Sequence, residues 1–252
     1  MISSSTNSPN IRVISDENKL FATAAKIIAD QLSSTIKQKG SATIALAGGR
    51  SAATLCEKLF KQKISWQNVH IFVIDERLVP INDEQSNFKI VNDSLIKPLN
   101  EKDNKTKKKS GKNSIPKENI HPFIYNPLVA DEGAEHYNEE LARAGGAFDV
   151  IFVSAGEDGH MAGLYPHHPL LSNRATGFAT FHDSPKPPAD RMTALPKNFL
   201  DANFSLLLIV GDAKREALNK LQNNNLTFKD CPSKLVTKSK NHLILTNLRK
   251  KK

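Results

Sequence analysis

A histidine beside two carboxylates is the most chemically informative group in this chain. His160 ends the segment Gly156–His160, in which Glu157 and Asp158 lie between glycines. An imidazole near its unperturbed pKa is a suitable general base at neutral pH. We predict that His160 and Asp158 are catalytic, with Glu157 or Asp75 as other carboxylates that could orient the ring. A capping or structural role is the alternative for a single histidine.

Paired glycines before an expected helix form a second candidate site. Gly48, Gly49 and Arg50 follow the apolar run 42–47, which is typical of a buried strand. At such a junction the backbone N–H groups and the helix dipole favour an anion. Paired glycines also occur in ordinary tight turns, so this motif alone leaves both interpretations open.

A third charged segment, Asp75-Glu76-Arg77, follows the apolar run 69–74. Adjacent charged residues at the end of a strand rarely serve packing. Because the carboxyl ends of parallel strands lie along one edge of a sheet, this segment, the paired glycines and His160 should converge on one pocket. That convergence indicates an enzyme.

Other chemistries fit the spacing of the residues less well. Asp158, His160, His167 and His168 could be considered as metal ligands, but their spacing matches no standard pattern, and we expect no metal. The Gly-x-Ser-x-Gly elbow of serine hydrolases is missing from the sequence, which argues against an acyl-enzyme.

Apolar periodicity indicates which elements position these residues. Helical and strand-like stretches alternate from end to end, which predicts a single α/β domain over residues 1–252 with an open, mostly parallel sheet sandwiched by helices. The expected strands are 42–47, 69–74, 120–124, 148–153, 176–181, 205–210 and 242–246. The expected helices are 17–39, one that follows Ser51, one that opens at Gln85, 131–143 and 212–222.

Charge and cysteine content restrict the partners and the compartment. The 252 residues carry a formal net charge of +9, much of it in the Lys-rich segment 101–117 and in residues 249–252. We expect a mobile insertion and a solvated tail there, and no nucleic-acid partner. The sequence has no apolar run long enough to span a membrane, and Cys56 and Cys231 make no disulfide framework. We therefore expect a cytoplasmic protein, monomeric or weakly homo-oligomeric, with a small anionic substrate.

Several segments taken together resemble the signature blocks of the 6-phosphogluconolactonases. They are Ala47–Ser51, Asp75–Pro80, Gly156–His160 with Leu164–Pro166, Pro187–Thr193 and Gly211–Lys214, in family order over about residues 15–246. The resemblance implies the open α/β sandwich shared with glucosamine-6-phosphate deaminases. It also implies hydrolysis of 6-phosphoglucono-δ-lactone to 6-phosphogluconate, in the oxidative pentose phosphate pathway, without a metal or an organic cofactor.

The same resemblance implies roles for individual residues. His160 would activate the water that attacks the lactone carbonyl and would then return the proton to the departing ring oxygen. The expected substrate-binding residues are Gly48, Gly49, Arg50, Asp75, Arg77, Arg191 and Lys214. Their cations would meet the phosphate or the developing oxyanion, and which cation meets which oxygen stays open.

Two alternatives remain: an enzyme of the same fold that catalyses another reaction, and a binding protein that is not an enzyme. A glucosamine-6-phosphate deaminase-like isomerase would share Asp75 and Asp158–His160, but it needs a glutamate after the histidine, and 161–171 contains no carboxylate. Release of ammonia from glucosamine 6-phosphate would favour it. A non-catalytic basic binding protein on the same scaffold would lose nucleic-acid retention when residues 101–114 are deleted.

Overall fold

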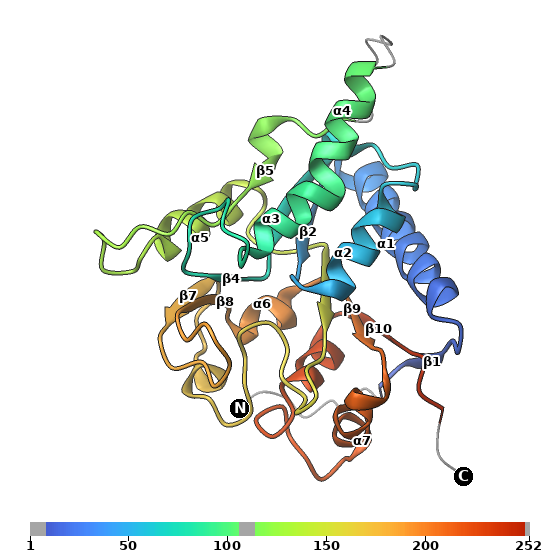
Figure 1. Cartoon of the computed structure of the whole chain (residues 1–252), viewed down its shortest axis with the longest axis vertical. Coiled ribbons are helices and arrows are strands. Elements are labelled where there is room, and N and C mark those ends of the chain that lie inside the picture. Colours follow the sequence, from blue (N-terminus) through green and yellow to red (C-terminus); the bar gives the residue numbers. More distant parts are fainter. Residues whose placement is uncertain (1–8, 106–113, 250–252) are drawn as a thin grey trace.

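The computed structural model describes residues 9–105 and 114–249, and in these residues the chain forms a central parallel sheet of seven strands (Figure 1). The strand order is β1-β10-β9-β6-β2-β3-β5, and neighbouring strands are parallel throughout. The strands are β1 (Ile11–Val13), β2 (Ala42–Leu46), β3 (Val69–Val73), β5 (Ile120–His121), β6 (Val150–Ser154), β9 (Phe204–Ile209) and β10 (Asn241–Thr246). The predicted open, mostly parallel sheet is confirmed.

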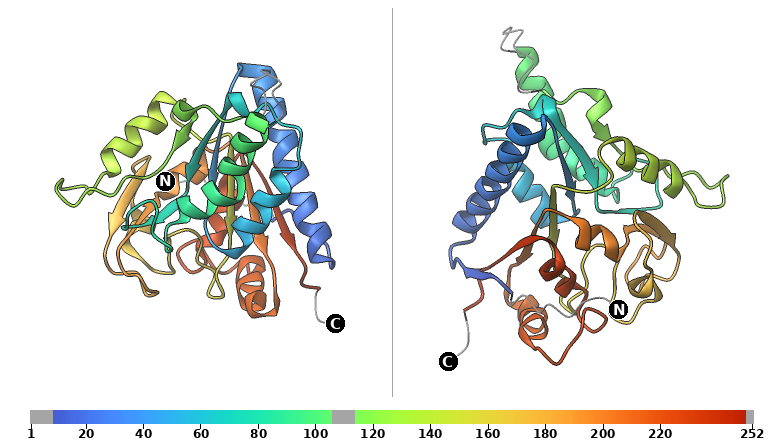
Figure 2. Two further views of the ribbon diagram at one scale, coloured as in Figure 1. Left: turned by 45° about the horizontal axis from the view of Figure 1, so that its top comes forward. Right: turned by 180° about the vertical axis from the view of Figure 1, so that it is seen from behind.

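Helices lie on both sides of this sheet (Figure 2). They are α1 (Glu17–Lys39), α2 (Arg50–Leu59), α3 (Asn87–Val91), α4 (Lys97–Lys105), α5 (Ala134–Arg143), α6 (Pro196–Asp201) and α7 (Arg215–Gln222). Because both faces are covered, the central strands are apolar along their length, and every residue of β2 and β9 is buried. This double coverage explains why strands appear in the sequence as continuous apolar runs.

Helix α1 shows how the local sequence sets the ends of an element. The Asp16 side chain accepts a hydrogen bond from the Lys19 backbone N–H at 2.7 Å and so caps the amino terminus of the helix. Gly40 ends it in the left-handed region with φ 88°, where a side chain would be strained. The predicted helix 17–39 is therefore confirmed at both ends.

A second, antiparallel sheet packs beside the first. Within the described residues it has three strands, in which β4 (Asp75–Arg77) pairs with β8 (Arg191–Ala194) and β8 pairs with β7 (Phe178–Phe181). The sequence predicts only β7 as a strand, because β4 and β8 are short and contain charged residues. The charged segment after β3 is thus a paired strand rather than a free loop.

Several predicted elements have different ends in the structure. The expected strand 120–124 is limited to β5, and the expected helix 131–143 begins only at Ala134. The expected helix 212–222 is a short 3₁₀ helix, Asp212–Lys214, followed by α7. Short strands and first turns shift easily because periodicity alone does not define them.

The Lys-rich segment 101–117 begins inside a helix. The helix expected from Gln85 runs as α3, a π-helix at Asn92–Ile96 and then α4 as far as Lys105. Ile115, near the other end of the segment, is only 2% exposed. Residues 106–113, the middle of the predicted mobile insertion, lie outside the described residues.

In the described part of the chain, no helix is both long and apolar enough to cross a membrane. Cys56 and Cys231 are free thiols and both are buried. Burial raises the pKa of Cys56 to about 12 and that of Cys231 to about 11, so neither is a thiolate at neutral pH. Both cysteines behave as packing residues.

Candidate active site

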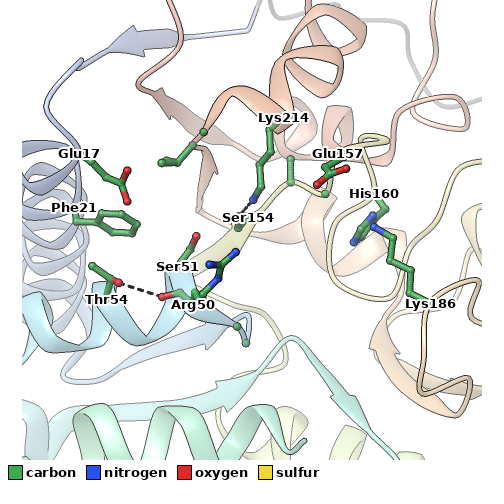
Figure 3. Close-up of a pocket in the computed structure, with 16 residues that line it drawn as sticks. Glu17, Phe21, Arg50, Ser51, Thr54, Ser154, Glu157, His160, Lys186 and Lys214 are labelled. Carbon is green, nitrogen blue, oxygen red and sulfur yellow. Dashed lines mark hydrogen bonds between the residues drawn. The ribbon is translucent and has the colours of Figure 1, made fainter.

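A pocket of about 610 Å³ opens at the carboxyl edge of the parallel sheet, where β2, β6 and β9 end (Figure 3). Loops that are far apart in the sequence meet there, as the convergence of strand ends predicts. The lining residues come from α1, from the segments after β2, β6 and β9, and from the loop before β8. They are Glu17, Phe21, Gly48, Gly49, Arg50, Ser51, Thr54, Ser154, Ala155, Gly156, Glu157, His160, Lys186, Val210, Gly211 and Lys214.

The paired glycines form the turn from β2 into α2. A Cβ at position 48 would overlap the side-chain amide of Asn87, so only glycine fits there. Gly49 has φ 83°, a conformation that favours glycine, and it precedes the first residue of α2. The first amides of a helix have no intrahelical acceptor, and this helix has no side-chain cap among the described residues. The turn can therefore offer N–H groups to an anion.

His160 is held by Asp158 in a compact turn after β6. The Nδ1 atom of His160 lies 2.5 Å from a carboxylate oxygen of Asp158, which also accepts the backbone N–H of His160 at 3.2 Å. A Cβ on residue 156 would overlap the imidazole, so Gly156 is required beneath the ring. With Nδ1–H donated to a carboxylate, Nε2 is left as the acceptor.

The imidazole remains neutral at neutral pH. Burial lowers the pKa of His160 below its ordinary value, and the nearby Lys186 ammonium acts in the same direction, whereas Asp158 opposes both. Burial also raises the pKa of Asp158, but the hydrogen bonds and charge of His160 outweigh it and leave the pKa below its ordinary value. A neutral imidazole beside an ionised carboxylate is the arrangement that a general base needs.

The opposite wall of the pocket is cationic. The Lys214 ammonium donates a hydrogen bond to the Ser154 hydroxyl at 2.8 Å, and Arg50 points toward the same region (Figure 3). Burial lowers the pKa of Lys214, as do Arg50 and Lys186, while Glu157 opposes them. A bound anion would relieve the repulsion between these cations.

Lys186 lies next to His160 in Figure 3, and no motif in the sequence predicts a role for it. Its loop is fixed by Arg191, whose guanidinium donates to the carbonyl oxygens of Lys186 at 3.2 Å, Pro187 at 3.1 Å and Pro188 at 3.0 Å. Arg191 is 5% exposed and does not line the pocket. It therefore positions a cation rather than serving as one in the pocket.

The segment Asp75–Arg77 lies behind the pocket. Asp75 is 6% exposed, and burial raises its pKa, opposed by Arg77, Arg191 and His160. The Arg77 guanidinium donates to the carbonyl oxygen of Gln85. Neither side chain is among the described lining residues, so both act at a distance from any pocket ligand.

The predicted site residues thus fall into three groups. Those that line the pocket are Gly48, Gly49, Arg50, His160 and Lys214. Asp158 touches His160 from behind, Arg77 and Arg191 donate to carbonyl oxygens of the surrounding loops, and Asp75 is buried outside the pocket lining. The sequence predicts no role for five lining residues, Glu17, Phe21, Ser51, Ser154 and Lys186, although the lone cation in the proline-rich segment 184–188 is a usable signal for Lys186.

The histidines considered as metal ligands face other partners. The His168 ring contacts Asp183 at 2.9 Å, and His167 lies 3.9 Å from Asp230. In residues 9–105 and 114–249 no group of three or more His, Cys, Asp or Glu side chains is placed to hold a metal ion. His160 has Asp158 as its partner instead.

Comparisons with known proteins bear on this geometry. Residues 15–245 match the family model of "Glucosamine-6-phosphate isomerases/6-phosphogluconolactonase". The chain is 33% identical over 208 residues to a 6-phosphogluconolactonase of Borreliella burgdorferi, covering 82% of this chain and 84% of that one. The crystal structure of a Thermotoga maritima 6-phosphogluconolactonase superposes with a TM-score of 0.75 at 25% identity, over 94% of this chain and 99% of that chain.

A glucosamine-6-phosphate deaminase described as monomeric has the same fold. It superposes with a TM-score of 0.75 at 20% identity, over 94% of this chain and 96% of the deaminase. At that identity the likeness speaks for the fold alone, so it does not discriminate between the two reactions of the family.

Proposed function

The chain belongs to the family of glucosamine-6-phosphate isomerases and 6-phosphogluconolactonases, and on that premise we propose that it hydrolyses 6-phosphoglucono-δ-lactone to 6-phosphogluconate, with His160 as the general base. The observation that carries the proposal is the His160–Asp158 pair at 2.5 Å in the wall of a pocket that also holds Arg50, Lys186 and Lys214. A neutral base and an anion site in one pocket match a phosphorylated ester substrate.

His160 performs the proton transfers. Its Nε2 takes a proton from water while the water oxygen bonds to the lactone carbonyl carbon. The tetrahedral intermediate then loses its bond to the ring oxygen, which receives the proton from the imidazolium. Asp158 keeps Nδ1 protonated and stabilises the imidazolium that forms between the two steps. The lactone is an activated ester, so positioning and one base suffice without a covalent intermediate.

The phosphate binds at the amino terminus of α2. Gly49, Arg50 and Ser51 line the pocket there, and Lys214 reaches across from the segment after β9. Backbone N–H groups, the helix dipole and two cations together suit a phosphate dianion. Ser154 fixes the direction of the Lys214 side chain through its hydrogen bond.

Lys186 stabilises the developing oxyanion. It lies beside His160, where the carbonyl carbon must be for attack by the activated water (Figure 3). A cation that is already in place when negative charge appears on oxygen lowers the barrier without reorganisation. Arg191 serves this step indirectly, because it fixes the loop that carries Lys186.

A direct test is the hydrolysis of freshly generated 6-phosphogluconolactone, corrected for spontaneous opening. Addition of the protein should accelerate acid release well beyond the spontaneous rate, and the unphosphorylated lactone should be hydrolysed far less efficiently. Equal efficiency with both lactones would contradict the phosphate site. Ammonia release from glucosamine 6-phosphate, with no lactone hydrolysis, would favour the deaminase alternative.

The same proposal includes the setting of the enzyme. A cytoplasmic location is supported by the free, buried thiols of Cys56 and Cys231. A monomer or weak homo-oligomer suffices, because one chain supplies the base and the anion site that the reaction needs. The proposed mechanism uses neither a metal, nor an organic cofactor, nor a nucleic acid.

A further inference from the structure

A second pocket, of about 380 Å³, shares no lining residue with the candidate active site. Its floor is apolar and contains Leu171, Leu200, Phe228 and Leu235. Its rim is basic and contains Arg174, Lys197, Lys229 and Lys238. No carboxylate is among the described residues that line it. We propose that this pocket binds a small organic anion with an apolar body, such as a fatty acid or an aryl sulfonate.

The two halves of such a ligand have separate partners. Small-molecule sites have volumes of roughly 300–1,000 Å³ and mostly apolar walls with a few polar groups, which this pocket matches. Arg174 and Lys229 are exposed, and their side chains make no hydrogen bond or ion pair with another described residue. Lys197 already pairs with Asp201 at 2.6 Å. Arg174 and Lys229 are therefore available for an acidic group at the rim.

One segment that lines this pocket also forms hydrogen bonds to the turn that carries His160. Phe228, Lys229 and Leu235 belong to the segment 227–238. In the same segment the Ser233 backbone N–H donates to the Gly159 carbonyl at 3.0 Å, and the Ser233 hydroxyl donates to it at 2.8 Å. Cys231 packs against Gly159 so closely that a Cβ there would overlap its sulfur. A ligand seated on this segment should alter the turn and the rate of hydrolysis.

Titration with anilinonaphthalene sulfonate tests the binding site, because the probe fluoresces in an apolar pocket. Ser172 is exposed on the rim, so Ser172→Trp should fill the pocket and abolish the signal, while Ser172→Ala should retain it. Arg174→Ala should weaken binding about tenfold through loss of one charge-assisted contact. Thermal melts of each variant report the fold.

Three results would overturn the proposal. They are an unchanged signal in folded Ser172→Trp, complete competitive displacement of the probe by 6-phosphogluconate, and loss of binding when the protein is concentrated into dimers. A fivefold coupling allows 6-phosphogluconate to shift the probe affinity only about fivefold, so displacement that continues without limit as 6-phosphogluconate rises would assign the probe to the active-site pocket. The third result would assign the pocket to a second copy of the chain.

Measurement of kcat/KM tests the coupling between the two pockets, and this part of the proposal rests on the proposed lactonase function. Saturating decanoate should change kcat/KM for the phosphorylated lactone about fivefold in the unmodified protein and not in Ser172→Trp. Binding without a change in rate would overturn the coupling. Since probe binding needs no catalysis, failure of the binding site and failure of the lactonase assignment are distinguishable.

Discussion

Two charged segments follow buried strands in this protein, and they have opposite fates. After β3, Glu76 is 1% exposed and accepts the backbone N–H groups of Arg77 at 2.8 Å, Asn87 at 2.7 Å and Phe88 at 2.8 Å. It also accepts the Ser86 hydroxyl at 2.9 Å. Three of these four hydrogen bonds serve the amino terminus of α3 and the fourth serves β4, so the group is structural.

After β6 the carboxylate has fewer partners and a chemical one. The side chain of Asp158 is 38% exposed, and its partners among the described residues are the ring and the backbone N–H of His160. The ring itself faces the pocket. Charged residues at a strand end therefore indicate function only when their hydrogen bonds lead to a titratable side chain that meets solvent. When the hydrogen bonds of a charged residue go to backbone N–H groups and a capping hydroxyl, as they do for Glu76, the residue has a structural role.

Among substitutions in the two segments, removal of the imidazole should have the largest effect on catalysis. We expect His160→Ala to lower kcat by about 10²–10⁴, the usual contribution of a general base, with the fold retained. Steady-state kinetics on the phosphorylated lactone measures this, and His136→Ala, at an exposed histidine of α5, is the matched control. Unchanged turnover in a folded His160→Ala protein would remove this residue from the mechanism.

Removal of the structural carboxylate should instead cost stability. Glu76→Ala leaves the buried N–H groups at the start of α3 without an acceptor, so the free energy of unfolding should fall by roughly 3 kcal/mol. Urea denaturation measures it, with Glu57→Ala on the exposed face of α2 as the control. The kcat of the folded fraction should change far less than in His160→Ala. Full stability with lost turnover would reverse the comparison between the two segments.

The cation opposite His160 should affect binding more than chemistry. Lys214→Met should raise KM for the phosphorylated lactone by roughly tenfold to a hundredfold, with a small change in kcat, because phosphate contacts are equal in ground and transition states. The unphosphorylated lactone should not detect the change. Lys26→Met on the exposed face of α1 is the control. A fall in kcat without a rise in KM would place Lys214 at the reacting carbonyl instead.

The smallest expected effect is a shift in the pH profile. Burial and then Lys186 lower the pKa of His160 from its ordinary 6.5, so the base stays neutral, and kcat/KM should stay high, down to a pH below that value. The rate should fall as pH drops through the lowered pKa. Lys186→Met removes one cause of the lowering, so the acid limb should move to higher pH. An acid limb that stays in place or moves lower would show that Lys186 does not act on the imidazole.

The sequence by itself determined the parallel sheet and the strand ends that meet at the pocket. Mostly apolar runs such as 42–47 and 205–210 are typical of strands buried on both faces, and such burial requires helices on both sides of the sheet. Gly48 and Gly49 follow such a run directly, and His160 follows the run 148–153 after a short turn, so their place at the carboxyl edge follows from local sequence.

Only the tertiary structure decided which charged groups reach the pocket. Arg191 and Lys186 are five positions apart in one segment, yet the arginine points back to hold the loop and the lysine points into the pocket. Arg77 is likewise held outside it by pairing of β4 with β8. The hydrogen-bond acceptors around a buried charged side chain fix its direction. Tertiary folding brings these acceptors into place, and the periodicity of the sequence does not predict where they lie.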